Sequence, residues 1–174
     1  MNNKKYINIL IFICLLVFVG MFELWPKKSY NNASLLWKQG HYQQAIDIWK
    51  QQLRISKNEN SDVYQNLIGS LIYIGKFNDA EKWCLKALTI FPQYVIFKFY
   101  ISLIEFYKGR YKKSLTLSES VLKQDNTYPN IHLLRGLDFK KLGNRNKAKK
   151  EFIEEINDNP SNTFAWVELK IFKK

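Results

Sequence analysis

Residues 64–92 read YQNLIGSLIYIGKFNDAEKWCLKALTIFP and contain the pattern that decides the fold. Apolar residues recur three and four positions apart on both sides of Gly75, and the segment ends at Pro92. This spacing indicates two amphipathic helices. Glycine often ends a helix because it adopts the left-handed conformation without steric cost. The segment therefore predicts a helix, a turn and a second, antiparallel helix.

The same pattern recurs along the chain with a nearly constant period. Glycine stands at positions 40, 75, 109 and 143, a small residue follows each glycine by five positions, and prolines close the second and fourth units. A small residue lets two antiparallel helices approach closely. The repeat-defining residues are Gly40, Ala45, Gly75, Ala80, Pro92, Gly109, Ser114, Gly143, Ala148 and Pro160.

This pattern resembles the tetratricopeptide repeat, a helix–turn–helix unit of about 34 residues. The resemblance implies an all-α fold in which antiparallel helical pairs stack as a right-handed superhelical α-solenoid. The four units span about residues 26–60, 61–94, 95–128 and 129–162, with a capping helix at 163–174. The expected helices are 30–38, 42–56, 61–74, 78–90, 94–107, 111–124, 130–142, 145–157 and 162–172.

The capping helix is expected to solvate the end of the stack, since each repeat is buried only by its neighbours. Phe164, Trp166 and Leu169 are predicted to cover the last repeat. The residues predicted to face water are Lys170, Lys173 and Lys174. The third unit departs from the family pattern. Glu105 stands where a large apolar residue is usual, and the first helix of that unit is apolar almost all round.

An apolar run precedes the repeats. Residues 7–25 read INILIFICLLVFVGMFELW and follow a short basic tail at 1–6. About 20 apolar residues cross a bilayer as a helix, so the run predicts one transmembrane signal-anchor helix and a single-pass membrane protein. A cleaved signal peptide is the alternative, but no small-x-small cleavage site follows the run. We expect an extracytoplasmic repeat domain, periplasmic in a bacterium, with a cytoplasmic one as the alternative.

The charge of the chain is strongly basic. Lys and Arg number 27 against 15 acidic residues, which gives a net charge of +12. Basic charge suits nucleic acid, anionic lipid or an acidic protein. Only four of the basic residues are Arg, the usual side chain for phosphate and base contacts, and the Lys residues are spread along the chain. A nucleic-acid partner is therefore disfavoured.

No residue pattern indicates catalysis, a metal site or a cofactor. His41 and His132 have no Cys, Asp or Glu at the sequence spacing of metal ligands or catalytic triads. Glu154 and Glu155 are adjacent on a predicted helix, so they diverge by about 100° and are expected on a solvated face. The two cysteines cannot form a disulfide framework. The sequence favours a non-enzymatic protein.

In the tetratricopeptide family, the first helix of each repeat lines a groove that binds a peptide or a helix of another protein. The groove positions implied by this resemblance are Trp37, Gln65, Ile72, Tyr73, Phe99, Leu103, Phe106, Leu133, Leu137 and Lys141. The Lys and Asn clamp that some members use for a C-terminal carboxylate is missing. The resemblance thus predicts an apolar and aromatic groove, centred on the third repeat. The alternative is that some of these side chains belong to the core or are covered by the end helix.

These features favour a membrane-tethered scaffold that binds another protein and assists the assembly or maturation of a cell-envelope complex. A cytosol-facing receptor or co-chaperone docked on a membrane is the alternative. A basic nucleic-acid-binding protein is a distant third. The sequence does not identify the partner protein or the oligomeric state.

Overall fold

The computed structural model describes residues 32–172. The predicted anchor at 7–25 and the basic tail at 1–6 lie outside the described residues, so both remain predictions. Among the helices within 32–172, none is long and apolar enough to cross a membrane. The described residues divide into two units, 32–63 and 64–172.

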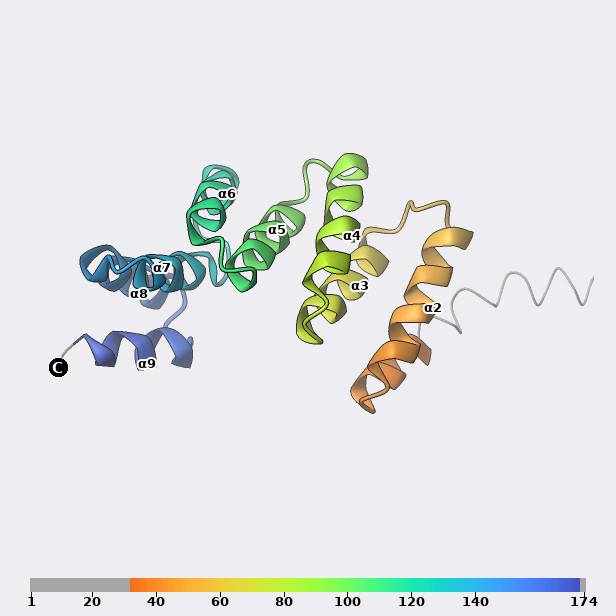
Figure 1. Ribbon diagram of the computed structural model, residues 1–174, viewed down its shortest axis with the longest axis horizontal. Coiled ribbons are helices and arrows are strands. Elements are labelled where there is room, and N and C mark those ends of the chain that lie inside the picture. The colour runs from red at the N-terminus through yellow and green to blue at the C-terminus, as the bar shows by residue number, and fades with distance from the viewer. Residues whose placement is uncertain (1–31, 173–174) are drawn as a thin grey trace, which may run out of the picture. The chain divides into compact units, whose positions relative to one another are not determined.

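The described residues are helical with short turns between the helices (Figure 1). Residues 32–38 are helical and precede the labelled elements. These elements are α2 Tyr42–Ile55, α3 Ser61–Tyr73, α4 Phe77–Ile90, α5 Val95–Tyr107, α6 Tyr111–Gln124, α7 Ile131–Lys141, α8 Arg145–Asp158 and α9 Thr163–Ile171.

The predicted helices are confirmed over the described residues, with ends that differ by a residue or two. The four repeat glycines all have positive φ: +84° at Gly40, +75° at Gly75 and Gly109, and +78° at Gly143. A side chain at these positions would be strained. The glycine period therefore marks the turn inside each helical pair, as the sequence indicated.

The described part of the first unit has an aromatic cluster. The Trp37 ring lies 4.5 Å from that of Tyr42 and 6.1 Å from that of Trp49, between ring centroids. Trp49 is buried, together with Ala45, Ile46 and Leu53 on the same face of α2. This spacing gives α2 the apolar stripe that its helical pair requires.

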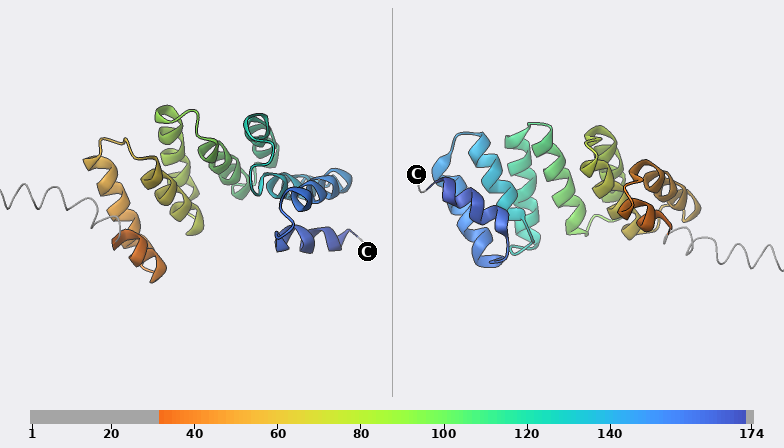
Figure 2. Two further views of the ribbon diagram at one scale, coloured as in Figure 1. Left: turned by 180° about the vertical axis from the view of Figure 1, so that it is seen from behind. Right: turned by 90° about the horizontal axis from the view of Figure 1, so that it is seen from below.

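In the second unit the helices alternate in direction, and successive helices α4 to α9 pack against each other (Figure 2). The first helix of one pair, α5, also contacts the first helix of the next pair, α7. Among the described helices, no two second helices of neighbouring pairs make a contact of similar extent. The first helices are therefore the more closely spaced series, which places them on the inner side of this unit.

Small residues let the two helices of a pair approach closely. Ala80, Ser114 and Ala148, which follow their glycines by five positions, are all fully buried. The fourth repeat contains an exchange of volumes: a Cβ on Gly136 would lie 2.4 Å from the Phe152 ring. The missing side chain at Gly136 thus accommodates the large buried ring on the facing helix.

A pair of polar residues is buried between the third and fourth repeats. The Ser114 hydroxyl donates a hydrogen bond of 2.6 Å to Asp138 Oδ2, and both residues are fully buried. Burial raises the pKa of Asp138 to about 7, although the Ser114 hydrogen bond and the charge of Arg135 act in the opposite direction. Asp138 therefore stays protonated up to a higher pH than an exposed carboxyl does.

The unusual Glu105 is fully buried and paired. Its carboxylate accepts hydrogen bonds from Arg110 Nη1 at 3.1 Å and Lys113 Nζ at 2.9 Å. Both cations come from the turn after α5 and the first residues of α6. The departure from the apolar pattern is thus compensated by two local positive charges, as a buried carboxylate requires.

The prediction that Glu155 lies on a solvated face is wrong. Glu155 is buried, and its carboxylate accepts hydrogen bonds from the backbone N–H groups of Asn130 and Leu133 and from Asn162 Nδ2. These N–H groups lie at the start of α7, where backbone donors lack partners within the helix. A side chain from α8 therefore caps α7, which the sequence of α8 alone could not reveal.

The predicted orientation of the capping helix is also wrong in part. The buried residue of α9 is Ala165. Phe164 is 75% exposed, and Trp166 is exposed as well, while Leu169 is partly buried. Asn162 caps the helix by accepting from the Ala165 N–H. This cap and the contact at Ala165 set the rotation of α9, so Phe164 points away from the repeat that it was expected to cover.

We predict that Ala80→Trp strongly destabilises the protein. Ala80 is fully buried in α4, and overpacking a tight core site costs roughly 1–3 kcal/mol or more. Thermal unfolding followed by circular dichroism should show a melting temperature several degrees lower. Lys82→Trp, at an exposed position of the same helix, is the matched control and should change little. Equal melting temperatures for the two variants would contradict the assigned repeat register.

We predict that Asp138→Asn becomes progressively more stabilising, relative to the wild type, as the pH rises. The folded pKa of Asp138, about 7, lies above the ordinary value of 3.8. Its contribution to stability is therefore complete below about pH 4 and is lost as the pH rises through 7. The difference in unfolding free energy should grow over this range by up to about 4 kcal/mol.

Urea unfolding of both proteins at several pH values measures this difference. Asp79→Asn, at an exposed position, is the control and should show no such trend. A difference between Asp138→Asn and wild type that stays constant from pH 4 to pH 8 would show that Asp138 ionises normally.

Candidate partner-binding groove

The inner helices of the second unit present apolar residues at corresponding positions of the repeat. Phe99 and Leu103 on α5 correspond to Leu133 and Leu137 on α7, and all four are partly exposed. Since i and i+4 lie on one face of a helix, these residues form an apolar line from one inner helix to the next. We call this line the candidate groove. It continues onto α9 with Val167 and Ile171, which gives six residues in all.

The groove contains a hollow of about 380 Å³ near its α3 end. Its walls come from the end of α3, the following turn and one face of α5. The lining residues are Gly69, Ile72, Tyr73, Gly75, Phe77, Tyr100, Leu103 and Tyr107. An engineered apolar cavity of about 150 Å³ already holds benzene. The hollow is therefore large enough for a bulky side chain.

Aromatic rings dominate the hollow. Phe77 and Tyr107 stack with ring centroids 5.1 Å apart and planes 6° from parallel. Tyr73 and Tyr107 are 67% and 52% exposed, so the hollow opens to solvent between them. Burial raises the pKa of Tyr100 to about 12, so its hydroxyl remains protonated at physiological pH.

Three of the residues expected in the groove, Ile72, Tyr73 and Leu103, line this hollow. Phe99 and Phe106 do not. The Phe99 ring contacts Tyr128 at 5.2 Å and the Phe106 ring contacts Tyr111 at 5.6 Å, between centroids. Both rings are partly buried on the α6–α7 side of α5. They contribute packing within the domain in addition to any contact with a partner.

The other expected groove residues lie at several places. Trp37 belongs to the aromatic cluster of the first unit. Gln65 is partly buried on α3, and Lys141 is exposed at the end of α7.

Sequence reasoning missed the continuation of the groove onto α9. Val167 and Ile171 occupy the positions one repeat length after Leu133 and Leu137, and they are 57% and 46% exposed. The repeat period could have found them, but α9 was expected to be a solvating cap. Sequence reasoning also missed Tyr100 and Phe77 in the hollow. The Tyr100 hydroxyl lies 3.4 Å from the place of a Cβ on Gly69, where the next repeats have leucine.

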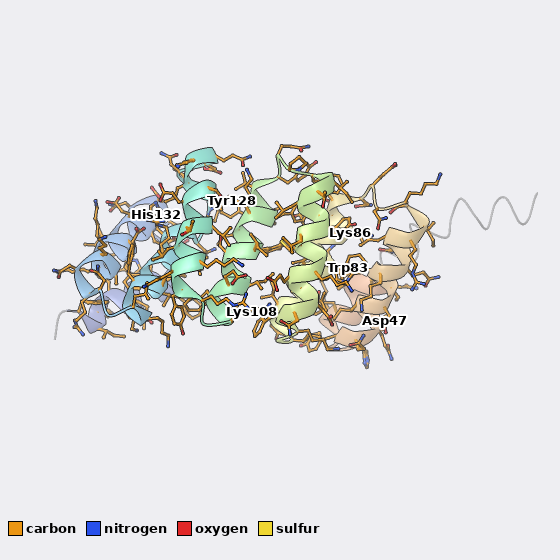
Figure 3. All side chains as sticks on the ribbon, turned by 45° about the horizontal axis from the view of Figure 1, so that its top comes forward. Asp47, Trp83, Lys86, Lys108, Tyr128 and His132 are labelled. Carbon is orange, nitrogen blue, oxygen red and sulfur yellow. The ribbon has the colours of Figure 1, made fainter. Side chains whose placement is uncertain are left out.

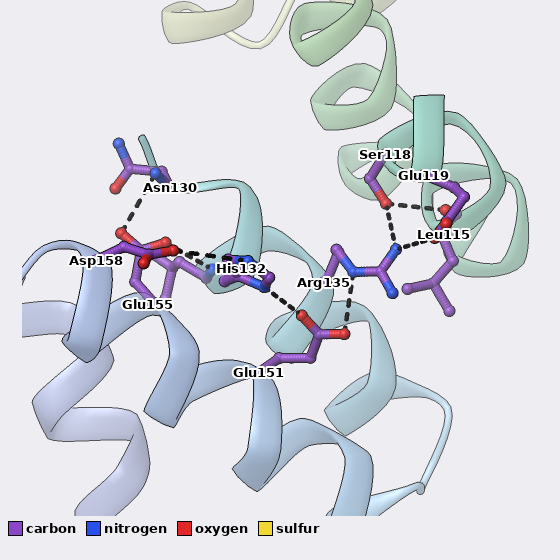
Figure 4. A network of polar contacts seen from close by, with 10 residues as sticks. Leu115, Ser118, Glu119, Asn130, His132, Arg135, Glu151, Glu155 and Asp158 are labelled. Atoms are coloured by element: carbon purple, nitrogen blue, oxygen red, sulfur yellow. Dashed lines mark hydrogen bonds and ion pairs between the residues drawn. The ribbon is translucent and has the colours of Figure 1, made fainter. Parts of the chain in front are cut away.

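A network of charged groups joins α6, α7 and α8 (Figure 4). His132 Nδ1 lies 2.7 Å from Glu151 Oε2, and Arg135 Nε donates to Glu151 Oε1 at 3.0 Å. Arg135 also reaches Glu119 at 3.3 Å. The Glu151 hydrogen bond raises the pKa of His132 despite burial. Burial alone would raise the pKa of Glu151, but His132 and Arg135 outweigh it and lower that pKa.

The acidic partners of His132 come from α8, far along the chain, so sequence spacing did not reveal them. Within residues 32–172, no group of three or more His, Cys, Asp or Glu side chains is placed to hold a metal ion. The network thus connects neighbouring repeats through ion pairs.

The outer helix α4 carries charge over aromatic surface. Lys86 Nζ lies 5.2 Å from the centroid of the Trp83 ring, one turn away on α4 (Figure 3). Lys108, just after α5, pairs with Glu81 on the same outer helix.

The arrangement of paired helices, buried small residues and an inner apolar line matches proteins of known structure. The fold is that of the tetratricopeptide-repeat proteins. YrrB, described as a tetratricopeptide-repeat protein with an unusual peptide-binding site, superposes with a TM-score of 0.69 and 19% identity over 83% of this chain and 74% of YrrB.

Two further structures are similar. TTC0263, a protein of Thermus thermophilus, has a TM-score of 0.71 and 19% identity over 85% of this chain and 82% of its own. MamA of Desulfovibrio magneticus has a TM-score of 0.71 and 17% identity over 84% of this chain and 82% of MamA. No family model matches the sequence, and no curated protein matches it. At these identities the likeness establishes the fold.

Proposed function

We propose that this protein is a scaffold that binds another polypeptide along the inner face of its repeats and performs no catalysis. One observation carries the proposal: apolar residues that remain partly exposed on α5 and α7, and exposed on α9, recur at the same two positions of three successive inner helices. These residues are Phe99, Leu103, Leu133, Leu137, Val167 and Ile171. Contiguous exposed apolar surface of this kind marks interaction sites.

Apart from Phe99, whose ring also packs against Tyr128, this apolar line lies outside the buried core of the second unit. The core of the second unit is formed by other faces of the same helices, with Phe97, Ile104, Ile131 and Leu134 buried. Exposed apolar side chains lose contact with water when a partner covers them, and each buried methylene contributes about 0.8 kcal/mol. A partner with an apolar face is therefore the natural ligand for this surface.

We further propose that the scaffold is tethered to a membrane by residues 7–25 and assists the assembly or maturation of a cell-envelope complex. The support is the length and composition of the apolar run, with Lys4, Lys5, Lys27 and Lys28 at its ends. The repeats are proposed to lie outside the cytoplasm. A cytosol-facing receptor or co-chaperone is the second candidate, because the lysines on the two sides of the run are balanced.

We predict that the N-terminal run is retained in the mature chain and is not needed for folding of the repeats. A fragment of residues 27–174 should be soluble and mostly helical by circular dichroism, since the buried repeat residues lie within it. N-terminal sequencing of the protein from native membranes tests retention. A mature chain that begins near residue 26 would show that the run is a cleaved signal peptide.

We predict that partner contacts concentrate on the inner helices. A photo-crosslinking amino acid replaces Tyr73 or Lys141, both exposed at inner positions, in the full-length chain in its native membrane. Leu85 on α4 and Ile153 on α8 are matched controls, because they are exposed apolar residues of outer helices. Discrete protein adducts should form from the inner positions only.

Protease accessibility of the repeats in intact and in opened cells separates the two locations. Adducts of equal yield from Leu85 or Ile153 would contradict the inner-face assignment. A steep salt dependence of DNA binding would favour the nucleic-acid interpretation instead.

A further inference from the structure

One inner position breaks the regular line of apolar residues. Leu103, Leu137 and Ile171 occupy the same position in successive repeats, and the corresponding residue one repeat before Leu103 is Gly69. Gly69 lies within α3, where glycine costs roughly 1 kcal/mol of helix stability relative to alanine. Its backbone does not adopt a positive φ, and a Cβ at this position would meet only Tyr100, at 3.4 Å from the hydroxyl oxygen. Neither backbone geometry nor packing therefore demands a glycine.

The absence of a side chain at Gly69 has a visible consequence: the hollow of about 380 Å³ lies directly over it. Leucine at this position, as in the following repeats, would project into that space. The Tyr100 hydroxyl stands at the wall beside Gly69. It has no hydrogen-bond partner among the described residues, so it is available as a donor or acceptor for a bound group.

The inner face carries positive charge at the end of α7. Lys140 and Lys141 occupy the positions one repeat length after Phe106 and Tyr107, and so continue the inner face. Glu168 pairs with Lys140, whereas Lys141 is exposed and makes no ion pair with the described residues. The hollow itself has no charged lining residue. A ligand that enters the hollow and extends toward α7 thus meets apolar surface first and positive charge next.

We propose that the hollow over Gly69 receives one bulky side chain, aromatic or leucine-sized, of a partner polypeptide whose neighbouring residues are acidic and reach Lys141. This inference rests on the proposed function and specifies its partner. Packed helices lie about 8–10 Å apart, and an extended chain advances about 3.3 Å per residue. Acidic residues about three to six positions from the inserted side chain therefore reach the α7 end of the groove.

The test uses Gly69→Leu with Gly69→Ala as the matched control. Both substitutions raise helix propensity. Alanine leaves nearly all of the hollow open, whereas leucine places its branched end inside it. Lys141→Glu is the second variant, and it reverses a charge at an exposed position that has no ion-pair partner to lose among the described residues. Circular dichroism and thermal unfolding verify that all three variants are folded.

The probe is a phage-displayed library of random peptides of about twelve residues, selected on the immobilised full-length chain. We expect selected peptides to combine a bulky apolar residue with acidic residues three to six positions away. A synthetic copy of the most enriched peptide should bind Gly69→Ala as well as wild type, and bind Gly69→Leu at least about tenfold more weakly. Lys141→Glu should weaken binding about fivefold at low salt, and less at high salt.

Three results would overturn the inference, and they differ in what they say of the proposed function. Peptides that bind Gly69→Leu as tightly as wild type but lose binding in Leu137→Asp would show that the groove binds polypeptides without using the hollow. Peptides that are indifferent to all of these substitutions, or no enrichment at all, would refute the proposed groove as well. Enrichment of basic or wholly polar peptides would refute the stated partner chemistry.

Discussion

The close approach of two helices at one small buried residue is the constraint on which this structure depends. Ala45, Ala80, Ser114 and Ala148 are all fully buried, and each follows by five positions a glycine with positive φ. The glycine reverses the chain, and the small residue lets the returning helix pack closely. Because the distance along the chain between these two events is the same in every unit, the pairs are nearly identical. Near-identical pairs are what allow stacking.

Once the pairs stack, the interfaces between them need a way to fix register, and this protein does so in part with polar groups. Ser114 binds Asp138 across the α6–α7 interface, and Glu155 of α8 caps α7. A buried polar group is costly when its partner is displaced. A slip of one helix along its neighbour would leave these carboxyls unpaired. The polar contacts therefore favour one arrangement of the third and fourth repeats over its neighbours.

The features that sequence predicted are local or periodic. Helix ends, turn glycines and small contact residues follow from spacing within a single repeat, and they were confirmed over the described part of the chain. The features that sequence missed depend on a second element whose rotation is unknown in advance. Glu155 looked solvated because its donors lie in α7 and in the turn before α9. Phe164 looked buried because the contact at Ala165 could not be foreseen.

The residues predicted for the candidate site also fall into a part that repeat spacing located correctly and a part that depends on packing. Ile72, Tyr73 and Leu103 were placed in the groove by repeat register, and they line the hollow. Phe99 and Phe106 were expected to form its centre, yet their rings contact Tyr128 and Tyr111. The period of the sequence gives the face of a helix, but one face includes side chains that lean toward either neighbour. Only the packed structure decides between the two sides.

The repeat architecture also separates positions that specify the fold from positions that are free to vary. Where a departure falls on a packing position, the structure contains its compensation: Gly136 accommodates Phe152, and Arg110 and Lys113 neutralise Glu105. Gly69 and Lys141 depart from their repeats at inner positions that solvent reaches. At Gly69 the Tyr100 hydroxyl lies near the place of a Cβ but the hollow stays open, and Lys141 makes no ion pair with the described residues. A residue that differs from its counterparts in the other repeats, without a role in packing, is free to be chosen for contact with a bound partner. In the proposed function, the uneven chemistry of the inner face, aromatic at the hollow and basic at the end of α7, is the feature that would set which polypeptide binds.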